Sequence, residues 1–297
     1  MFMVLFKNFY INSKAFMRNS LPLPLILIVE KFRVIPLYFK WKKDKKYGSQ
    51  NFIKKNKGLK GSFQGKRCVI IGNGPSLNKT DLSLLKNEYT FGLNRIYLLF
   101  DRLGFETDFL VSANRYVIEQ FSDEMLQTNC KKFFNYKFKK EIKNKDNVSF
   151  ITATPFGSKY FDNIEKGYMA YSGSVTFVAI QLALYFGFSE IILIGFDNNF
   201  KNSGPSDKAI KSKKSDEDHF DKNYFGKGIV WQLPNYHALN YNFDFVKNFF
   251  DQKKHLNIVN CSVGGELHVF ERYDLEFYLK NSIFENKICS TNLGKGE

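Results

Sequence analysis

Two short apolar runs that each end in glycine most constrain the fold of this chain. They are Cys68–Gly72 (CVIIG) and Glu190–Gly195 (EIILIG), and both are typical of a buried strand that enters a turn. Ser174–Phe186 has the spacing of an apolar helix, and we expect further strands at residues 89–93, 108–112, 147–152 and 256–260. Strands that alternate with helices in this way indicate βαβ units. The sequence therefore predicts an α/β fold with a mostly parallel sheet flanked by helices.

The alternating pattern occupies residues 63–265, which we interpret as one domain. An apolar and basic N-terminal extension, residues 1–62, precedes it, and a C-terminal helix and tail, residues 266–297, follow it. Inside the domain, residues 199–232 are rich in Lys, Ser and Asp and hold no apolar run. Loops of this length in compact domains tend to be functional lids or disordered inserts, and we interpret this one as a lid.

Charge and composition narrow the classes of partner. The 297 residues include 44 Lys+Arg and 29 Asp+Glu, a net charge of +15 that favours anionic partners. Nucleic acid is not expected, because lysine outnumbers arginine and no zinc-finger or leucine-zipper pattern is present. No apolar run approaches the ~18–20 residues of a membrane-spanning helix. The four cysteines form no CxxC pair, which fits a reducing, cytoplasmic setting.

The N-terminal extension combines an apolar centre, Leu21–Val29 (LPLPLILIV), with a polybasic stretch at residues 40–60. This combination is typical of peripheral attachment to an anionic leaflet, here the inner membrane, at roughly 1 kcal/mol per well-placed lysine. The alternative is an extension that packs on its own domain or on a partner. A homo-oligomer is also left open.

The turn after the first strand is a candidate nucleotide site. Gly72 and Gly74 allow a tight turn and a close approach to a ligand, which in parallel sheets binds at the carboxyl ends of the strands. Ser76 stands where a following helix would begin, and free N–H groups there attract phosphate or carboxylate. The turn matches neither GxGxxG nor a P-loop. The alternative is an ordinary strand-to-helix turn.

Three asparagines, Asn73, Asn94 and Asn114, follow three different predicted strands. Their amides carry two donors and an acceptor each, which suits them to ribose hydroxyls and a base edge. Ser172, Gly173 and Ser174 directly precede the apolar helix, where a serine is first of all an N-cap. The same hydroxyls and backbone N–H groups are able to hold a substrate carboxylate.

The lid carries the remaining candidates. His219 follows the acidic residues 216–218, which would raise its basicity and suit it to act as a general base. Two other interpretations are Mg²⁺ binding by Asp216, Asp218 or Asp221 and a solvated charge run. Asp197, Tyr224 and Lys227 are candidate phosphate or lid contacts.

These residues together resemble two related families. They resemble the bacterial sialyltransferases that use CMP-sialic acid, and they are also similar to the related MptE-like superfamily. The shared pieces are VIIGNGPSL (69–77), FGLN (91–94), the Asn114 turn, SGS and EIILIGFD (172–197) and the lid histidine. The MptE-like superfamily includes hydroxymethylpterin pyrophosphokinases and motility-associated flagellin glycosyltransferases. The resemblance covers roughly residues 66–265 and implies a Rossmann-like catalytic domain.

The resemblance implies a role for each matching residue. Gly72, Asn73, Gly74, Ser76, Asn94 and Asn114 would hold the cytidine nucleotide. Ser172, Gly173 and Ser174 would hold the donor sugar, and His219 would be the catalytic base. The chain departs from the sialyltransferases at Asn198 and Asn199, where they have tyrosines. Another nonulosonate such as pseudaminic acid, or a different nucleotide sugar, is therefore also credible as the donor.

The function implied is an inverting glycosyltransferase that moves sialic acid or a related nonulosonate from a CMP-activated donor to a hydroxyl of a cell-surface glycan. No metal or other cofactor is required for this reaction. The alternatives are an MptE-like pyrophosphokinase, which would use Mg²⁺ and ATP, and a non-catalytic nucleotide-binding protein.

Overall fold

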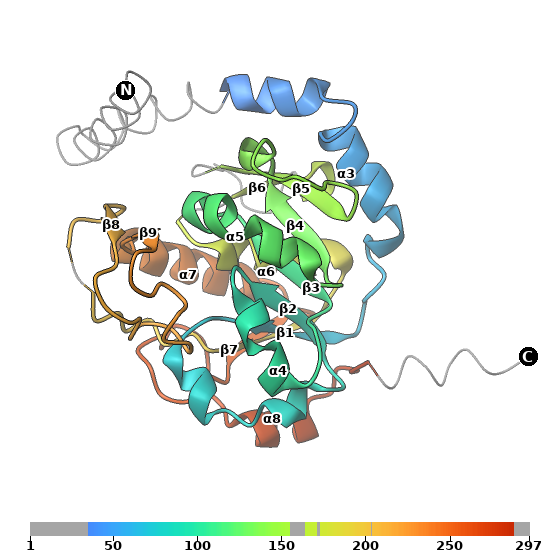
Figure 1. Cartoon of the computed structure of the whole chain (residues 1–297). Helices are drawn as coiled ribbons and strands as arrows, with labels where there is room; N and C mark the ends of the chain where they lie inside the picture. Colours follow the sequence, from blue (N-terminus) through green and yellow to red (C-terminus); the bar gives the residue numbers. More distant parts are fainter. Residues whose placement is uncertain (1–34, 155–163, 171–172, 203, 288–297) are drawn as a thin grey trace, which may run out of the picture.

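The computed structural model describes residues 35–154, 164–170, 173–202 and 204–287. At their centre lies one sheet of eight strands in the order β10-β7-β1-β2-β3-β4-β5-β6, and every pairing in it is parallel (Figure 1). The strands are β1 (Arg67–Ile71), β2 (Tyr89–Leu93), β3 (Phe109–Ser112), β4 (Lys131–Asn135), β5 (Val148–Thr154), β6 (Tyr168–Ala170), β7 (Glu190–Ile194) and β10 (Asn257–Asn260). The predicted α/β fold class is confirmed, and its arrangement is Rossmann-like.

Helices cover this sheet, and the most deeply buried of them is α6 (Val175–Phe186), in which eleven of twelve residues are buried. It packs against β1, β2 and β3 and ends at Gly187, whose positive φ closes the helix. The other helices are α3 (Ser49–Asn56), α4 (Phe100–Leu103), α5 (Arg115–Gln127), α7 (Tyr236–Asp251) and α8 (Leu275–Asn281). The turn after β1 continues as a short 3₁₀ helix, Pro75–Lys79.

The strand order reverses its direction next to β1. The chain runs outward from β1 through β2 to β6 and then returns through α6 to place β7 on the other side of β1. In such sheets the loops that leave the two neighbouring strands diverge and open a crevice at the strands' carboxyl ends. The topology therefore predicts a ligand site where β1 and β7 end.

The described part of the predicted N-terminal extension packs on the domain. Residues 35–43 form a helix, and its Trp41 is 1% exposed, with its ring 5.0 Å from that of Tyr136 and its indole N–H donating to the carbonyl of Lys166. Phe52 of α3 is equally buried and contacts Tyr185 of α6. Residues 1–34 lie outside the described residues, so the division of the chain at residue 62 stays a prediction.

The structure adds elements that the sequence does not predict. Strands β4 and β6 and helix α5 are new, and residues 199–232 contain the hairpin β8 (Ala209–Lys211) and β9 (Val230–Gln232). Within the described ranges, no helix is both long enough and apolar enough to cross a bilayer.

Candidate active site

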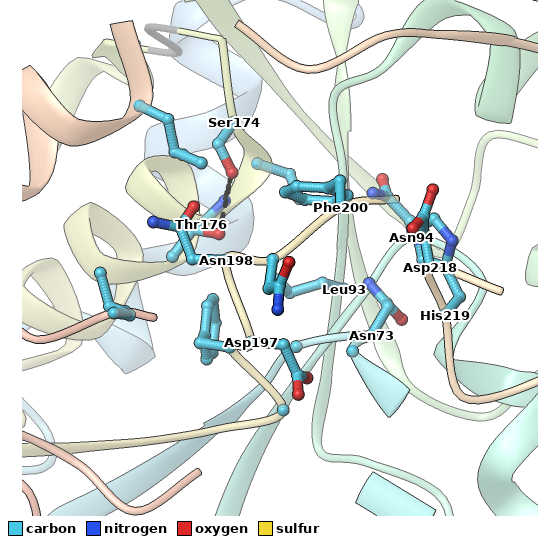
Figure 2. A pocket seen from close by; sticks show the side chains of 18 of the residues that line it. Asn73, Leu93, Asn94, Ser174, Thr176, Asp197, Asn198, Phe200, Asp218 and His219 are labelled. Carbon is cyan, nitrogen blue, oxygen red and sulfur yellow. Dashed lines mark hydrogen bonds between the residues drawn. The ribbon is translucent and has the colours of Figure 1, made fainter. Parts of the chain in front are cut away.

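A cavity of about 180 Å³ opens where β1, β2 and β7 end, between the start of α6 and the loop that carries His219 (Figure 2). Of the residues predicted from the sequence, those that line it are Gly72, Asn73, Gly74, Asn94, Ser174, Asp197, Asp218 and His219. In Figure 2, His219 lies beside Asn73 and Asn94 on one side of the cavity, and Ser174 and Thr176 lie on another. The fold therefore brings together candidates as distant in the chain as Gly72 and His219, which are 147 positions apart.

The turns after β1 and β7 touch, and this contact requires glycine. A Cβ on Gly72 would overlap the carbonyl oxygen of Gly195, and a Cβ on Gly74 would overlap Oδ2 of Asp197. The same oxygen of Asp197 accepts hydrogen bonds from the Ser76 hydroxyl (2.8 Å) and backbone N–H (3.2 Å). Ser76 does not line the cavity, so it positions Asp197 rather than facing the predicted nucleotide.

The three predicted asparagines have three different environments. Asn94 has a left-handed backbone (φ 52°), and its carboxamide oxygen accepts a hydrogen bond from the Ser112 hydroxyl (3.1 Å). The carboxamide oxygen of Asn73 is buried and finds no partner among the described residues. Asn114 does not line the cavity, because its oxygen caps α5 by accepting from the N–H groups of Tyr116 and Val117. A nucleotide contact at Asn114 therefore has no support in the geometry.

The start of α6 faces the cavity through Ser174 and Thr176. The Ser174 hydroxyl accepts from the Thr176 N–H (3.2 Å) and donates to the Thr176 hydroxyl (2.9 Å), so the predicted N-cap is confirmed. Ser172 lies outside the described residues. Gly173 is exposed, has a positive φ of 87° and does not line the cavity.

His219 is held by a buried carboxylate. Its Nδ1 lies 2.8 Å from Oδ2 of Asp216, which also accepts from the N–H of Phe225, while Oδ1 accepts from the N–H of Asp218. Burial raises the pKa of the Asp216 carboxyl, but the hydrogen bonds from His219 and the two backbone N–H groups outweigh it and leave the pKa below its ordinary value. An ionised Asp216 keeps the proton on Nδ1 and leaves the lone pair on Nε2, the tautomer of a general base.

The ring of His219 stacks on that of Tyr224, with 4.1 Å between ring centroids and an interplanar angle of 5°. Tyr224 is 1% exposed and does not line the cavity, so its ring supports the histidine from the protein interior, and a phosphate contact at Tyr224 has no support in the geometry. Arg95 anchors Tyr224 by donating from its guanidinium to the carbonyls of Asn223 (2.9 Å) and Tyr224. Lys227 is exposed and does not line the cavity.

The His219 loop is fastened to the turn after β1. The N–H of Phe220 donates to the carbonyl of Asn73 (2.9 Å), and the Asn78 side chain donates to the carbonyl of Phe220 (3.0 Å). Asp218, which also lines the cavity, is 4% exposed and accepts from the N–H groups of Lys201 and Asn202. The predicted lid is thus docked over the cavity at its histidine.

The family model described as 6-hydroxymethylpterin diphosphokinase MptE-like matches residues 46–203, more than half of the chain. The chain belongs to the MptE-like family. The solved structure of MAf glycosyltransferase from Magnetospirillum magneticum AMB-1 is similar at 14% identity and a TM-score of 0.48. That similarity covers 84% of this chain and 42% of the other, so the chain spans less than half the length of that enzyme. No curated protein matches the chain significantly.

The family name raises the question whether this MptE-like chain has ligands for Mg²⁺. Both oxygens of Asp216 and of Asp218 already accept hydrogen bonds from within the loop. Oδ1 of Asp221 accepts from the Asn223 N–H. In the part of the chain that the structure describes, no group of three metal-binding side chains occurs. With both oxygens already engaged in hydrogen bonds, Asp216 and Asp218 do not fit the predicted alternative of a magnesium site.

Sequence reasoning missed several residues of this MptE-like site. Thr176, Asn198 and Phe200 all line the cavity. Thr176 stands two positions after the N-cap Ser174, and Asn198 stands four positions after the end of β7, so the signal was their closeness to predicted residues. Phe200 carries no such signal, since its position depends on how the lid folds back. Asp218, which the sequence offers only as a possible Mg²⁺ ligand, lines the cavity as well.

Proposed function

We propose that this chain is an inverting glycosyltransferase that moves sialic acid or a related nonulosonate from a CMP-activated donor to a hydroxyl of a cell-surface glycan. The observation that supports it is the His219–Asp216 pair at the edge of a cavity at the carboxyl ends of β1, β2 and β7. A base held by a buried carboxylate suits removal of a proton from an acceptor hydroxyl.

In the proposed reaction the acceptor oxygen attacks the anomeric carbon of the sugar while the bond from that carbon to the phosphate oxygen breaks. CMP leaves with the bonding electrons, and the acceptor proton passes to Nε2 of His219. Attack opposite to the leaving group inverts the anomeric centre. The carboxylate of the nonulosonate would lie at the N-terminus of α6, where the positive end of the helix dipole and the hydroxyls of Ser174 and Thr176 line the cavity. No metal ion is required, because CMP is already a good leaving group.

The second candidate is the diphosphokinase of the family name. Its reaction would move diphosphate from ATP to a pterin alcohol with the help of Mg²⁺. The engaged carboxylates of Asp216 and Asp218 count against it.

Ligand-induced stabilisation separates the two candidates. We expect CMP at ~100 times its Kd to stabilise the full chain by about 2.7 kcal/mol in the presence of EDTA, because it binds only the folded state. Thermal unfolding with CMP, UMP, ADP and ATP measures this effect, and mass spectrometry of glycan acceptors incubated with CMP-sugars then identifies the product. Stabilisation by ATP only, and only with Mg²⁺, would favour the diphosphokinase.

The proposed site of action is the cytoplasmic face of the inner membrane, reached through the basic N-terminal region. Ile35 and Phe39 are 44% and 52% exposed on the helix of residues 35–43, and Lys40, Lys42 and Lys43 are exposed beside them. Apolar and cationic side chains on one short helix suit an anionic lipid surface.

We expect Phe39→Ser combined with Lys42→Glu and Lys43→Glu to weaken co-sedimentation with vesicles that contain one third phosphatidylglycerol. Trp41 stays in place, so the unfolding temperature should not change. Deleting residues 1–60 would remove the buried Trp41 and Phe52 and is therefore unsuitable as a test. If the wild type and the triple variant bind these vesicles equally well, the helix of residues 35–43 does not contribute to membrane binding.

A further inference from the structure

Asn198 combines three unusual features at the cavity. It follows β7, its backbone is left-handed (φ 49°), and its carboxamide oxygen is buried with no partner among the described residues. Its carboxamide nitrogen donates to the carboxamide oxygen of Asn240 (3.2 Å), which holds the group in one orientation.

The left-handed backbone and the unpaired oxygen each have a free-energy cost. A buried acceptor without a hydrogen bond loses its solvation, and such groups are few in folded proteins. A glycine would adopt the left-handed conformation without steric cost. The advantage of asparagine over glycine at this position is therefore its carboxamide group. Backbone strain such as this left-handed conformation is concentrated at functional sites.

A second oxygen has the same property. The carboxamide oxygen of Asn73, on the neighbouring turn after β1, is also buried and without a partner among the described residues. Its backbone carbonyl, by contrast, accepts from the N–H of Phe220. Two unpaired acceptors thus line one cavity, on the two adjacent turns where the topology opens the crevice.

We infer that Asn198, together with Asn73, accepts hydrogen bonds from hydroxyl or amino groups of the bound nucleotide. An acceptor oxygen repels phosphate and carboxylate, which present only acceptors at neutral pH. The two asparagines therefore mark the place of the ribose and base, while the N-terminus of α6 serves the anionic part of the ligand. This inference rests on the proposed function for the claim that the ligand is a nucleotide. It does not depend on which base that nucleotide carries.

The test is Asn198→Gly in the full chain. We expect the Kd for CMP, measured by calorimetry, to rise roughly tenfold through the loss of a buried hydrogen bond. The unfolding temperature of the ligand-free variant should stay the same or rise, since glycine relieves the left-handed strain and removes the unpaired oxygen. A purely structural asparagine would instead lower the unfolding temperature on replacement.

Asp207→Gly is the matched control. Asp207 is also left-handed (φ 62°), lies before β8 and does not line the cavity, so its replacement should leave the Kd for CMP unchanged. Equal CMP binding by wild type and Asn198→Gly would overturn the inference and leave the proposed donor intact. If wild type binds ATP instead of CMP and Asn198→Gly weakens that binding, the proposed function fails and the inference holds. No binding of CMP, UMP, ADP or ATP by the wild type would overturn both.

Discussion

Replacing His219 with glutamine is expected to lower kcat for sugar transfer by about 10²–10⁴-fold, the usual contribution of a general base. Glutamine keeps a polar side chain of similar reach against Asp216 but has no basic nitrogen. The loop stays fastened through the backbone bond from Phe220 to Asn73, so the Kd for CMP should change little. Initial rates with a CMP-sugar and calorimetry with CMP measure the two effects separately.

Two further variants sharpen this result. Asp216→Asn removes the negative charge beside Nδ1 and should lower kcat less than the loss of the imidazole does, because the base remains but its tautomer is no longer enforced. His255→Gln is the control, since His255 is exposed and does not line the cavity. Unchanged turnover in His219→Gln would remove the base from the proposed mechanism.

The second large effect is expected at Tyr224, whose ring forms the surface on which the imidazole lies. Tyr224→Leu should lower kcat by roughly 10²-fold, because a displaced base no longer reaches the acceptor proton. It should also lower the free energy of unfolding by roughly 1–3 kcal/mol through a cavity and the loss of aromatic contacts. Rates and chemical denaturation of the same preparation give both numbers.

Tyr224→Phe separates the ring from the hydroxyl. The hydroxyl accepts only a long hydrogen bond, 3.4 Å from the N–H of Arg95, so phenylalanine should retain most of the activity and stability. Arg95 itself is buried with its guanidinium 3.7 Å from the ring centroid of Phe121, and it holds the loop through the carbonyls of Asn223 and Tyr224. If Tyr224→Leu turns over as fast as Tyr224→Phe, the stacked ring does not position the base.

Local pattern was sufficient for several strands of the sheet, including the edge strand β10. β1, β2, β7 and β10 are short runs in which nearly every residue is buried, so their apolar residues are enough to predict them as strands. β4 begins with Lys131 and Lys132 and was not predicted. Lys132 is buried because its amino group donates to the carbonyls of Thr128 and Cys130, and an arrangement of that kind cannot be read from the order of residues.

The candidate site likewise has a part that the sequence predicts and a part that depends on the tertiary structure. That asparagines, glycines and serines stand at strand ends and at the start of a helix follows from the sequence, because these positions are defined by hydropathy period and turn chemistry. Which of Asn73, Asn94 and Asn114 faces the cavity was decided by the fold alone, since a carboxamide serves equally well as a helix cap or as a ligand contact. The stack of His219 on Tyr224 and the unpaired oxygen of Asn198 also belong to tertiary structure, because both depend on chain segments that meet only when the lid and the sheet pack together.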